Sequence, residues 1–368
     1  MILYQWRGAA RNFGDELNSL LWPSLLPGFF DQDPRVRFLG IGSVLDGRHD
    51  RRTLKLVAGS GYGGYEAPIA LDATWKIHWV RGRRTARLLG LPPMLGLGDP
   101  ASLLPLAGLS LTSPALASPL LTTGPPLTTG PLLIGPLLTG APLTGPPLAG
   151  LTPIPAARGI GFMPHFESAM RGAWREASAA AGVTLIDPRG DPLAVLAAIA
   201  RCDMLISEAL HGVIVADALR VPWIAIEPLA PIHRPKWRDW AETLDLDIVF
   251  QRLPPSTALE RAHLSGVARF HLGRCLLTHQ ARRLRVLAQG RYMEQAAEAL
   301  RVAMRAEPSL SHDAALERGQ TRMMEAVEVL RRMAPAGMDH GHRLKENHAP
   351  GTARSGWRER HFAADQGG

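Results

Sequence analysis

The chain has 368 residues, of which 46% are hydrophobic and 20% are charged, so it is long enough for roughly two domains, and a mini-protein is excluded. Its two cysteines suggest neither a disulfide framework nor a thiolate metal site. Lysine and arginine number 41 against 33 acidic residues, and the net charge of +8 favours an anionic partner. The sequence contains no recognised nucleic-acid module, so we expect no nucleic-acid binding.

Short β-type runs alternate with helical patterns over residues 1–100. Glycine-rich turns follow several of the predicted strand ends, and no secretory signal precedes the first strand, so we expect a cytoplasmic protein. The alternation is typical of a parallel sheet, and we interpret residues 1–100 as an N-terminal Rossmann-like domain of the α/β class. We predict strands at 2–6, 36–41, 53–58 and 75–80, and helical segments at 15–22 and 84–89.

The loop after the first predicted strand places Asn12, Gly14 and Asp15 at the start of a helix. Asparagine and aspartate satisfy free N–H groups and complement the helix dipole at such a position, so capping alone explains them as well as a functional role does.

A glycine-rich turn follows the third predicted strand, and Gly59, Gly61 and Gly64 formally satisfy G-x-G-x-x-G. The segment beyond it contains Pro68 and leads directly to another strand, which leaves little room for the crossover helix of a dinucleotide fold. We interpret Gly59 and Gly61 as a tight turn whose backbone approaches an anionic or hydroxylated ligand, with a plain turn and nicotinamide binding as the alternatives.

Arg81 directly follows the fourth predicted strand, at the carboxyl edge where open α/β sheets bind ligands. A guanidinium captures a carboxylate or phosphate through two parallel hydrogen bonds. Arg81 is therefore a candidate anion ligand, and a plain surface charge is the alternative.

Residues 101–157 form a low-complexity insertion of Leu, Pro, Gly, Thr and Ala without a charged residue. A membrane span needs ~20 largely uninterrupted apolar residues, whereas proline or glycine occurs here every few positions. We interpret the segment as a flexible, extended insertion, with a lipid-contacting arm as the alternative.

The alternation of strands and helices resumes over residues 158–255, which we interpret as a C-terminal Rossmann-like domain. Residues 256–333 read as a helical region, and 334–368 as a disordered tail whose composition cannot bury enough surface to order it. The strands predicted in 158–255 lie at 159–163, 183–186, 203–206 and 223–226, and the helices near 167–181, 191–201 and 208–219.

The strongest local pattern lies between the last two of these strands. Ser207 is placed to cap a helix, His211 falls in its first turn, and Gly212 removes a side chain that would block close approach. A ligand at this turn meets an imidazole and free N–H donors together. A packing or capping histidine is the alternative.

Several blocks, in order, resemble the polysaccharide pyruvyl transferase family, most closely its exopolysaccharide ketal-pyruvate transferases of the succinoglycan type. Many members carry arginine two residues before the histidine, where this chain has Ala209, and Arg81, Arg234 and Lys236 are the cations that we expect to replace it. The matching blocks are residues 4–8, 12–18, 59–61, 79–85, 97–100, 207–212 and 236–240.

The resemblance implies two Rossmann-like domains in a GT-B-like arrangement, with the site in the cleft between them. It further implies phosphoenolpyruvate as donor, a lipid-linked oligosaccharide as acceptor, peripheral contact with an anionic membrane, and no metal or organic cofactor. We expect His211, Glu208 and Asp15 to be catalytic. The expected substrate-binding residues are Asn12, Gly14, Gly59, Gly61, Arg81, His165, Gly212, Arg234 and Lys236.

Two other functions fit the sequence. A nucleotide-sugar glycosyltransferase shares the architecture, since a fold does not fix its chemistry. A non-catalytic membrane-surface assembly factor would use the basic helices and the Leu/Pro arm to dock on anionic lipid.

Overall fold

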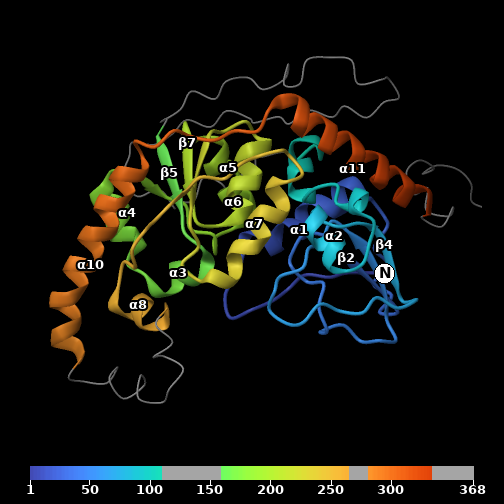
Figure 1. The fold of residues 1–368 in the computed structure, drawn as a ribbon, viewed down its shortest axis with the longest axis horizontal. Helices are drawn as coiled ribbons and strands as arrows, with labels where there is room; N and C mark the ends of the chain where they lie inside the picture. The colour runs from blue at the N-terminus through green and yellow to red at the C-terminus, as the bar shows by residue number, and fades with distance from the viewer. Residues whose placement is uncertain (110–158, 265–280, 334–368) are drawn as a thin grey trace, which may run out of the picture. The chain divides into compact units, whose positions relative to one another are not determined.

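The computed structural model describes residues 1–109, 159–264 and 281–333, and within them the strands form two parallel sheets. The predicted α/β class with parallel sheets is confirmed. The first sheet has the order β1-β2-β3-β4, and its strands follow the predicted ones with shorter ends (Figure 1). Its strands are β1 (Ile2–Leu3), β2 (Val36–Leu39), β3 (Leu54–Ala58) and β4 (Trp75–Trp79).

Helix α1 (Phe13–Leu25) connects β1 to β2. Apolar side chains recur every four residues along it, so Phe13, Leu17 and Leu21 lie on one buried face. The helix packs against α5 (Pro192–Ala200) and α6 (Leu210–Ala218), which belong to the second sheet. It therefore lies where the two halves of the fold meet.

The second sheet has the order β6-β5-β7-β8-β9, which is the doubly wound pattern with its first strand beside its third. In such a sheet ligands bind outside the carboxyl ends of the two strands between which the winding reverses, here β5 and β7. The strands are β5 (Ile160–Met163), β6 (Thr184–Leu185), β7 (Met204–Ser207), β8 (Trp223–Ile226) and β9 (Phe250–Gln251).

Two details of this half differ from the prediction. The helix expected at 167–181 is two helices, α3 (Phe166–Arg171) and α4 (Trp174–Ala181), separated by Gly172. The backbone of Gly172 is extended, and a Cβ there would lie 2.3 Å from the indole nitrogen of Trp174. The chain therefore breaks the helix to seat that indole. The edge strand β9 was not predicted, because two residues carry no periodic signal.

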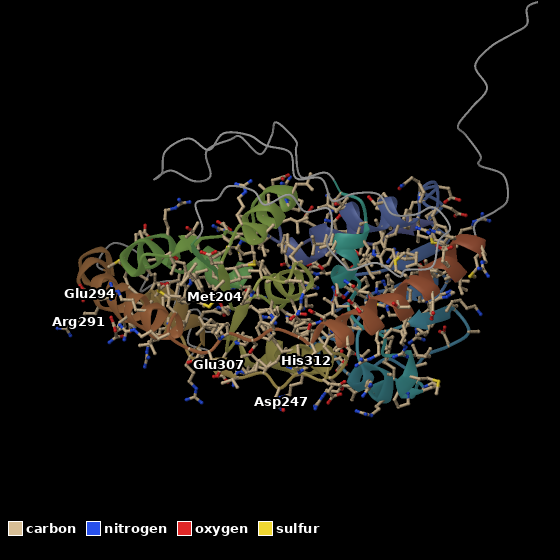
Figure 2. The ribbon with its side chains drawn as sticks, turned by 90° about the horizontal axis from the view of Figure 1, so that it is seen from above. Met204, Asp247, Arg291, Glu294, Glu307 and His312 are labelled. Atoms are coloured by element: carbon tan, nitrogen blue, oxygen red, sulfur yellow. The ribbon has the colours of Figure 1, made fainter. Side chains whose placement is uncertain are left out.

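In the described residues beyond the second sheet lie the helices α8 (Ala258–Leu264), α10 (Ala281–Ala303) and α11 (Asp313–Met333). Helix α10 packs against α4 (Figure 1), whereas α11 returns to the first half and packs against η2 (Pro100–Leu106), a 3-10 helix. Arg331 Nε of α11 donates to the carbonyl of Leu25 at 2.8 Å. Figure 2 shows Arg291 and Glu294 on α10 and, at the approach to α11, His312.

One core cluster contains side chains from both sheets and from α11, among them Trp79, Trp223 and Val327. The uncharged segment begins inside this core, because Ala101 and Leu104 of η2 are buried in it. The rest of that segment from residue 110, and the tail from residue 334, lie outside the described residues. Within the described part of the chain, no helix is long and apolar enough to cross a membrane.

Candidate active site

The loops at the carboxyl ends of both sheets line one pocket, a hollow of ≈ 920 Å³ that includes space open to solvent. From the first sheet, the loops after β1, β2 and β3 contribute. From the second, the loops after β5 and β7 contribute, as does the segment that leads into α7 (Arg234–Ala241). The lining includes Asn12, Gly14, Asp15, Ser43, Tyr65, His165, Glu167, His211, His233 and Lys236.

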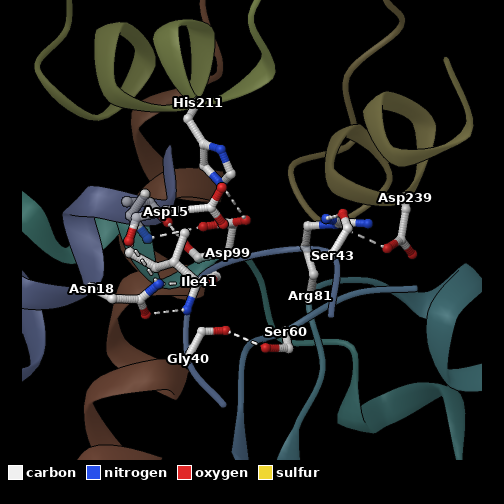
Figure 3. A network of polar contacts seen from close by, with 12 residues as sticks. Asp15, Asn18, Gly40, Ile41, Ser43, Ser60, Arg81, Asp99, His211 and Asp239 are labelled. Atoms are coloured by element: carbon white, nitrogen blue, oxygen red, sulfur yellow. Dashed lines mark hydrogen bonds and ion pairs between the residues drawn. The ribbon is translucent and has the colours of Figure 1, made fainter. Parts of the chain in front are cut away.

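His211 lies in the first turn of α6, as predicted, and its side chain is 16% exposed. Its Nε2 atom lies 3.4 Å from Oδ2 of Asp99, which is fully buried (Figure 3). Burial acts to raise the pKa of Asp99, but the charges of His211 and Arg81 and the hydrogen bond from the backbone N–H of Ala101 together hold that pKa below its ordinary value. The Asp99 carboxylate beside the ring fixes the orientation of the imidazole.

Gly14 is explained by the same imidazole. A Cβ at this position would lie 1.9 Å from Nδ1 of His211, so any side chain here would displace the ring. The absence of a side chain at the start of α1 therefore allows the two halves of the pocket to come into contact.

Asp15 points into the pocket beside His211 (Figure 3), and its side chain is 7% exposed. Asn12 Nδ2 donates to its Oδ2 atom at 2.6 Å. Burial raises the pKa of Asp15 to about 6, although the nearby charges of His211 and Lys236 lower it. A carboxylate with that pKa is well matched to accept a proton near neutrality.

The loop after β2 is held on α1 by a buried asparagine. Asn18 donates to the carbonyl of Ile41 and accepts from its backbone N–H, both at 2.8 Å (Figure 3). The same side chain accepts from Trp22 Nε1 at 3.1 Å. These bonds fix Gly42 and Ser43 at the wall of the pocket.

Lys236, on α7, is the basic residue in the pocket without a partner. Within the described part of the chain its ammonium has no hydrogen bond or ion pair, although the side chain is half-buried. Burial lowers its pKa to about 8. Arg234, by contrast, is paired with Glu227 at 3.1 Å and does not line the pocket. Of these two candidate replacements for the family arginine at Ala209, the geometry favours Lys236.

Arg81 also does not line the pocket, and its side chain is fully buried. Nε donates to Oδ2 of Asp239 on α7 at 3.1 Å, and Nη1 donates to Ser43 Oγ at 2.9 Å (Figure 3). Asp239 also accepts from the backbone and the hydroxyl of Thr85. In this arrangement Arg81 ties the first sheet to α7, the helix that carries Lys236, rather than offering its guanidinium to an anion in the pocket.

We expect Arg81→Met to lower the free energy of unfolding by about 3–5 kcal/mol, because it leaves the Asp239 carboxylate buried without its cation. Arg84→Met is the matched control. Arg84, on α2 (Arg83–Leu88), pairs at 2.6 Å with Glu242, the residue after α7, but its side chain is 47% exposed, so its loss costs less than about 1 kcal/mol. Urea unfolding of both variants measures the difference. Equal losses would contradict a buried tie at Arg81.

The glycine turn after β3 leaves room for the buried side chain of Arg81. A Cβ at Gly61 would lie 2.3 Å from Cζ of Arg81, and one at Gly59, where φ is +99°, would lie 2.1 Å from Cγ of Pro100. Neither glycine lines the pocket. No helix lies between residues 59 and 74, before β4, so the crossover helix of a dinucleotide-binding fold is absent there.

Glu208 lies behind the pocket and does not line it. Its carboxylate accepts from the backbone N–H of His165 at 2.9 Å and of Leu229 at 3.0 Å, and from Ser168 Oγ at 3.1 Å. Burial raises its pKa to about 7. Its contacts position the loops after β5 and β8. Gly212 allows α6 to pack closely onto β7, because a Cβ at this position would lie 2.6 Å from Ser207 Oγ.

Sequence reasoning missed four side chains of the site: Tyr65, Asp99, Glu167 and His233. His165 and His233 stack with ring centroids 4.3 Å apart, and Tyr65 Oη lies 3.2 Å from Nδ1 of His233. Burial lowers the pKa of both histidines. Asp99 lies in one of the blocks that resemble the family, residues 97–100, but nothing in that block predicts its contact with His211.

The chain is similar in sequence to known proteins. A family model described as polysaccharide pyruvyl transferase matches residues 162–228, the span that includes Glu208 and His211. The chain is also 32% identical over 358 residues to the succinoglycan biosynthesis protein ExoV of Rhizobium meliloti (strain 1021). That similarity covers 89% of this chain and 98% of the relative. No solved structure matches the chain.

Proposed function

Since the chain belongs to the polysaccharide pyruvyl transferase family and is thus a transferase, we propose that it moves pyruvate from phosphoenolpyruvate onto a sugar of a lipid-linked exopolysaccharide repeat unit. The relative is named as a succinoglycan biosynthesis protein, which supports an exopolysaccharide acceptor. The observation that carries the proposal is a single pocket that holds an imidazole paired with a buried carboxylate, a second carboxylate and an unpaired ammonium.

The donor is a small molecule with two anionic groups, a carboxylate and a phosphate. Lys236 offers the pocket a cation that makes no hydrogen bond or ion pair within the described residues, and Asn12 and Ser43 line the same wall. Binding the anions next to His211 would hold the reacting double bond within reach of the imidazole, which replaces a bimolecular encounter by a fixed geometry.

The reaction requires protons to move in both directions. His211 gives a proton to the methylene carbon of the enol ester, which becomes a methyl group and leaves an oxocarbenium-like C2. Asp15 accepts the proton of the first sugar hydroxyl as that oxygen bonds to C2. Phosphate then leaves with the proton that Asp15 holds, and the second hydroxyl adds to C2 and gives its proton to His211, which closes the cyclic ketal and restores both groups. Asp99 stabilises the imidazolium before the first transfer.

The architecture supports the same proposal. Both sheets present their carboxyl edges to the pocket, and α11 returns from the second half to pack on the first. We infer a GT-B-like arrangement of two Rossmann-like halves, with the acceptor entering between them. A lipid-linked acceptor would place the reaction at the inner face of the cytoplasmic membrane.

The test is incubation of the full chain with phosphoenolpyruvate and a panel of lipid-linked glycans. We expect the mass of one glycan to increase by one pyruvate ketal and inorganic phosphate to be released in equal amount. Lys236→Gln should raise KM for phosphoenolpyruvate, whereas Lys76→Gln, an exposed lysine on β4, should not. Release of a nucleoside diphosphate from a nucleotide sugar instead would identify a glycosyltransferase and overturn the proposal.

A further inference from the structure

One group of side chains at the pocket is left over by the proposed reaction. His165, Glu167 and His233 come from the loop after β5, from α3 and from the 3-10 helix Pro231–His233. Each offers one ligand atom, and these atoms all lie within 4.8 Å of one another. All three residues line the pocket that also holds His211. Two imidazoles and a carboxylate form a donor set that suits zinc and related divalent ions.

Distances within the group fit a metal. Nε2 of His233 lies 3.5 Å from Oε2 of Glu167. Bonds of about 2.0–2.2 Å at tetrahedral angles separate two ligands by about 3.4 Å, so this pair already stands at ligand spacing. The ring atom of His165 lies within 4.8 Å of both, at most about 1.4 Å beyond that spacing, which a side-chain adjustment can close.

One ring atom of the group is buried without a hydrogen bond. His233 is 6% exposed; its Nδ1 faces Tyr65 Oη at 3.2 Å, and its Nε2 faces Glu167 at 3.5 Å but makes no hydrogen bond within the described residues. His165 is 7% exposed, and its ring makes no hydrogen bond there either. A buried polar atom without a hydrogen bond costs free energy. A cation bound between His233 and Glu167 would satisfy Nε2 of His233.

The surroundings supply the supports that metal ligands use. Tyr65 Oη lies 3.2 Å from Nδ1 of His233, which orients the ring and leaves Nε2 for a metal. The backbone of His165 is fixed by Glu208 at 2.9 Å. Arg171 lies 3.6 Å from Glu167, a partly exposed contact whose loss costs less than about 1 kcal/mol.

We propose that His165, Glu167 and His233 bind a divalent cation of the zinc class, with an open coordination position toward the pocket. Three protein ligands and a free position are the pattern of a site where the metal also meets water or an anionic oxygen of a substrate. The proposal does not depend on pyruvyl transfer, because metal binding is measured without donor or acceptor.

Cobalt(II) titration of the full chain, freed of any histidine tag, tests this site, since Co²⁺ bound by histidine and carboxylate gives visible absorption that the aqueous ion lacks. We expect an absorption band that saturates and is abolished by excess Zn²⁺. Glu167→Gln and His233→Ala should each remove it, and Tyr65→Phe should weaken Co²⁺ binding by about 10–100-fold. His312→Ala, at an exposed histidine outside the pocket, should leave it unchanged.

Histidines in the C-terminal stretch, at positions 340, 342, 348 and 361, can also take up Co²⁺, so the signal of the site is the difference between the parent chain and Glu167→Gln. Circular dichroism of each variant shows that it is folded. Co²⁺ spectra that are the same in the parent chain, Glu167→Gln and His233→Ala would overturn the proposal, as would the absence of any band. Metal binding in a chain that fails to transfer pyruvate would reject the proposed function alone.

Discussion

His211→Ala should lower kcat for pyruvate transfer by about 10²–10⁴-fold, because it removes the group that protonates the methylene carbon of the donor. KM for phosphoenolpyruvate should change much less, since the anions of the donor are bound by other side chains. Release of inorganic phosphate, followed under saturating acceptor, measures both constants. His312→Ala is the matched control: it removes an exposed imidazole that does not line the pocket.

The Asp99→Asn variant tests whether the imidazole of His211 takes part in the reaction or only lies near it. Asp99 acts through His211, so its loss should reduce kcat less than the loss of the imidazole does. Addition of Asp99→Asn to His211→Ala should cost little more. Turnover of His211→Ala equal to that of His312→Ala would exclude the imidazole from the chemistry.

Asp15→Asn should reduce kcat by about 10²–10⁴-fold while making the protein more stable at neutral pH. The native pKa of Asp15 is about 6, above the value of about 3.9 in an unfolded chain. Between these pH values the native state binds the extra proton, so this group makes the free energy of unfolding fall as the pH rises from about 4 to 6. Above pH 6 the loss reaches at most about 3 kcal/mol.

Urea unfolding at several pH values checks this sign. The stability gained by Asp15→Asn should be greatest at pH 7 and should vanish below about pH 4, where the parent carboxyl is protonated in both states. Glu16→Gln, in the same turn of α1 but with a side chain that is not buried, is the control and should leave both stability and turnover nearly unchanged. A gain that does not depend on pH would show that burial of the charge is not its cause.

The sequence was sufficient to predict the parallel strands and the position of His211, because both are local signals. Strand periodicity and a turn before a helix are written in neighbouring residues. The contact of His211 with Asp99 joins positions on either side of the uncharged segment, and that of Arg81 with Asp239 spans 158 positions. Neither pairing leaves a local pattern, so the sequence indicated an arginine at a sheet edge but not that a buried carboxylate from α7 already holds it.

The glycines show the same limit. Gly61 and Gly212 were predicted to be sites of close approach by a ligand, but what approaches them is a guanidinium and a serine hydroxyl of the protein itself. A glycine in a sequence indicates that another group can approach the backbone closely, but only the fold identifies that group. The split of the predicted helix at Gly172 has the same origin, since an indole occupies the space that a continuous helix would need.

The position of α11 has a consequence for how the protein is made. Leu316, Met323 and Leu330 of this helix are buried in the core cluster that also holds side chains of α1. A ribosome delivers the N-terminal strands long before it delivers these residues, so the first half of the chain keeps part of its apolar surface uncovered until residues 313–333 have been made. Domains that fold as they emerge escape this interval, whereas here a later helix completes the part of the chain that was made first.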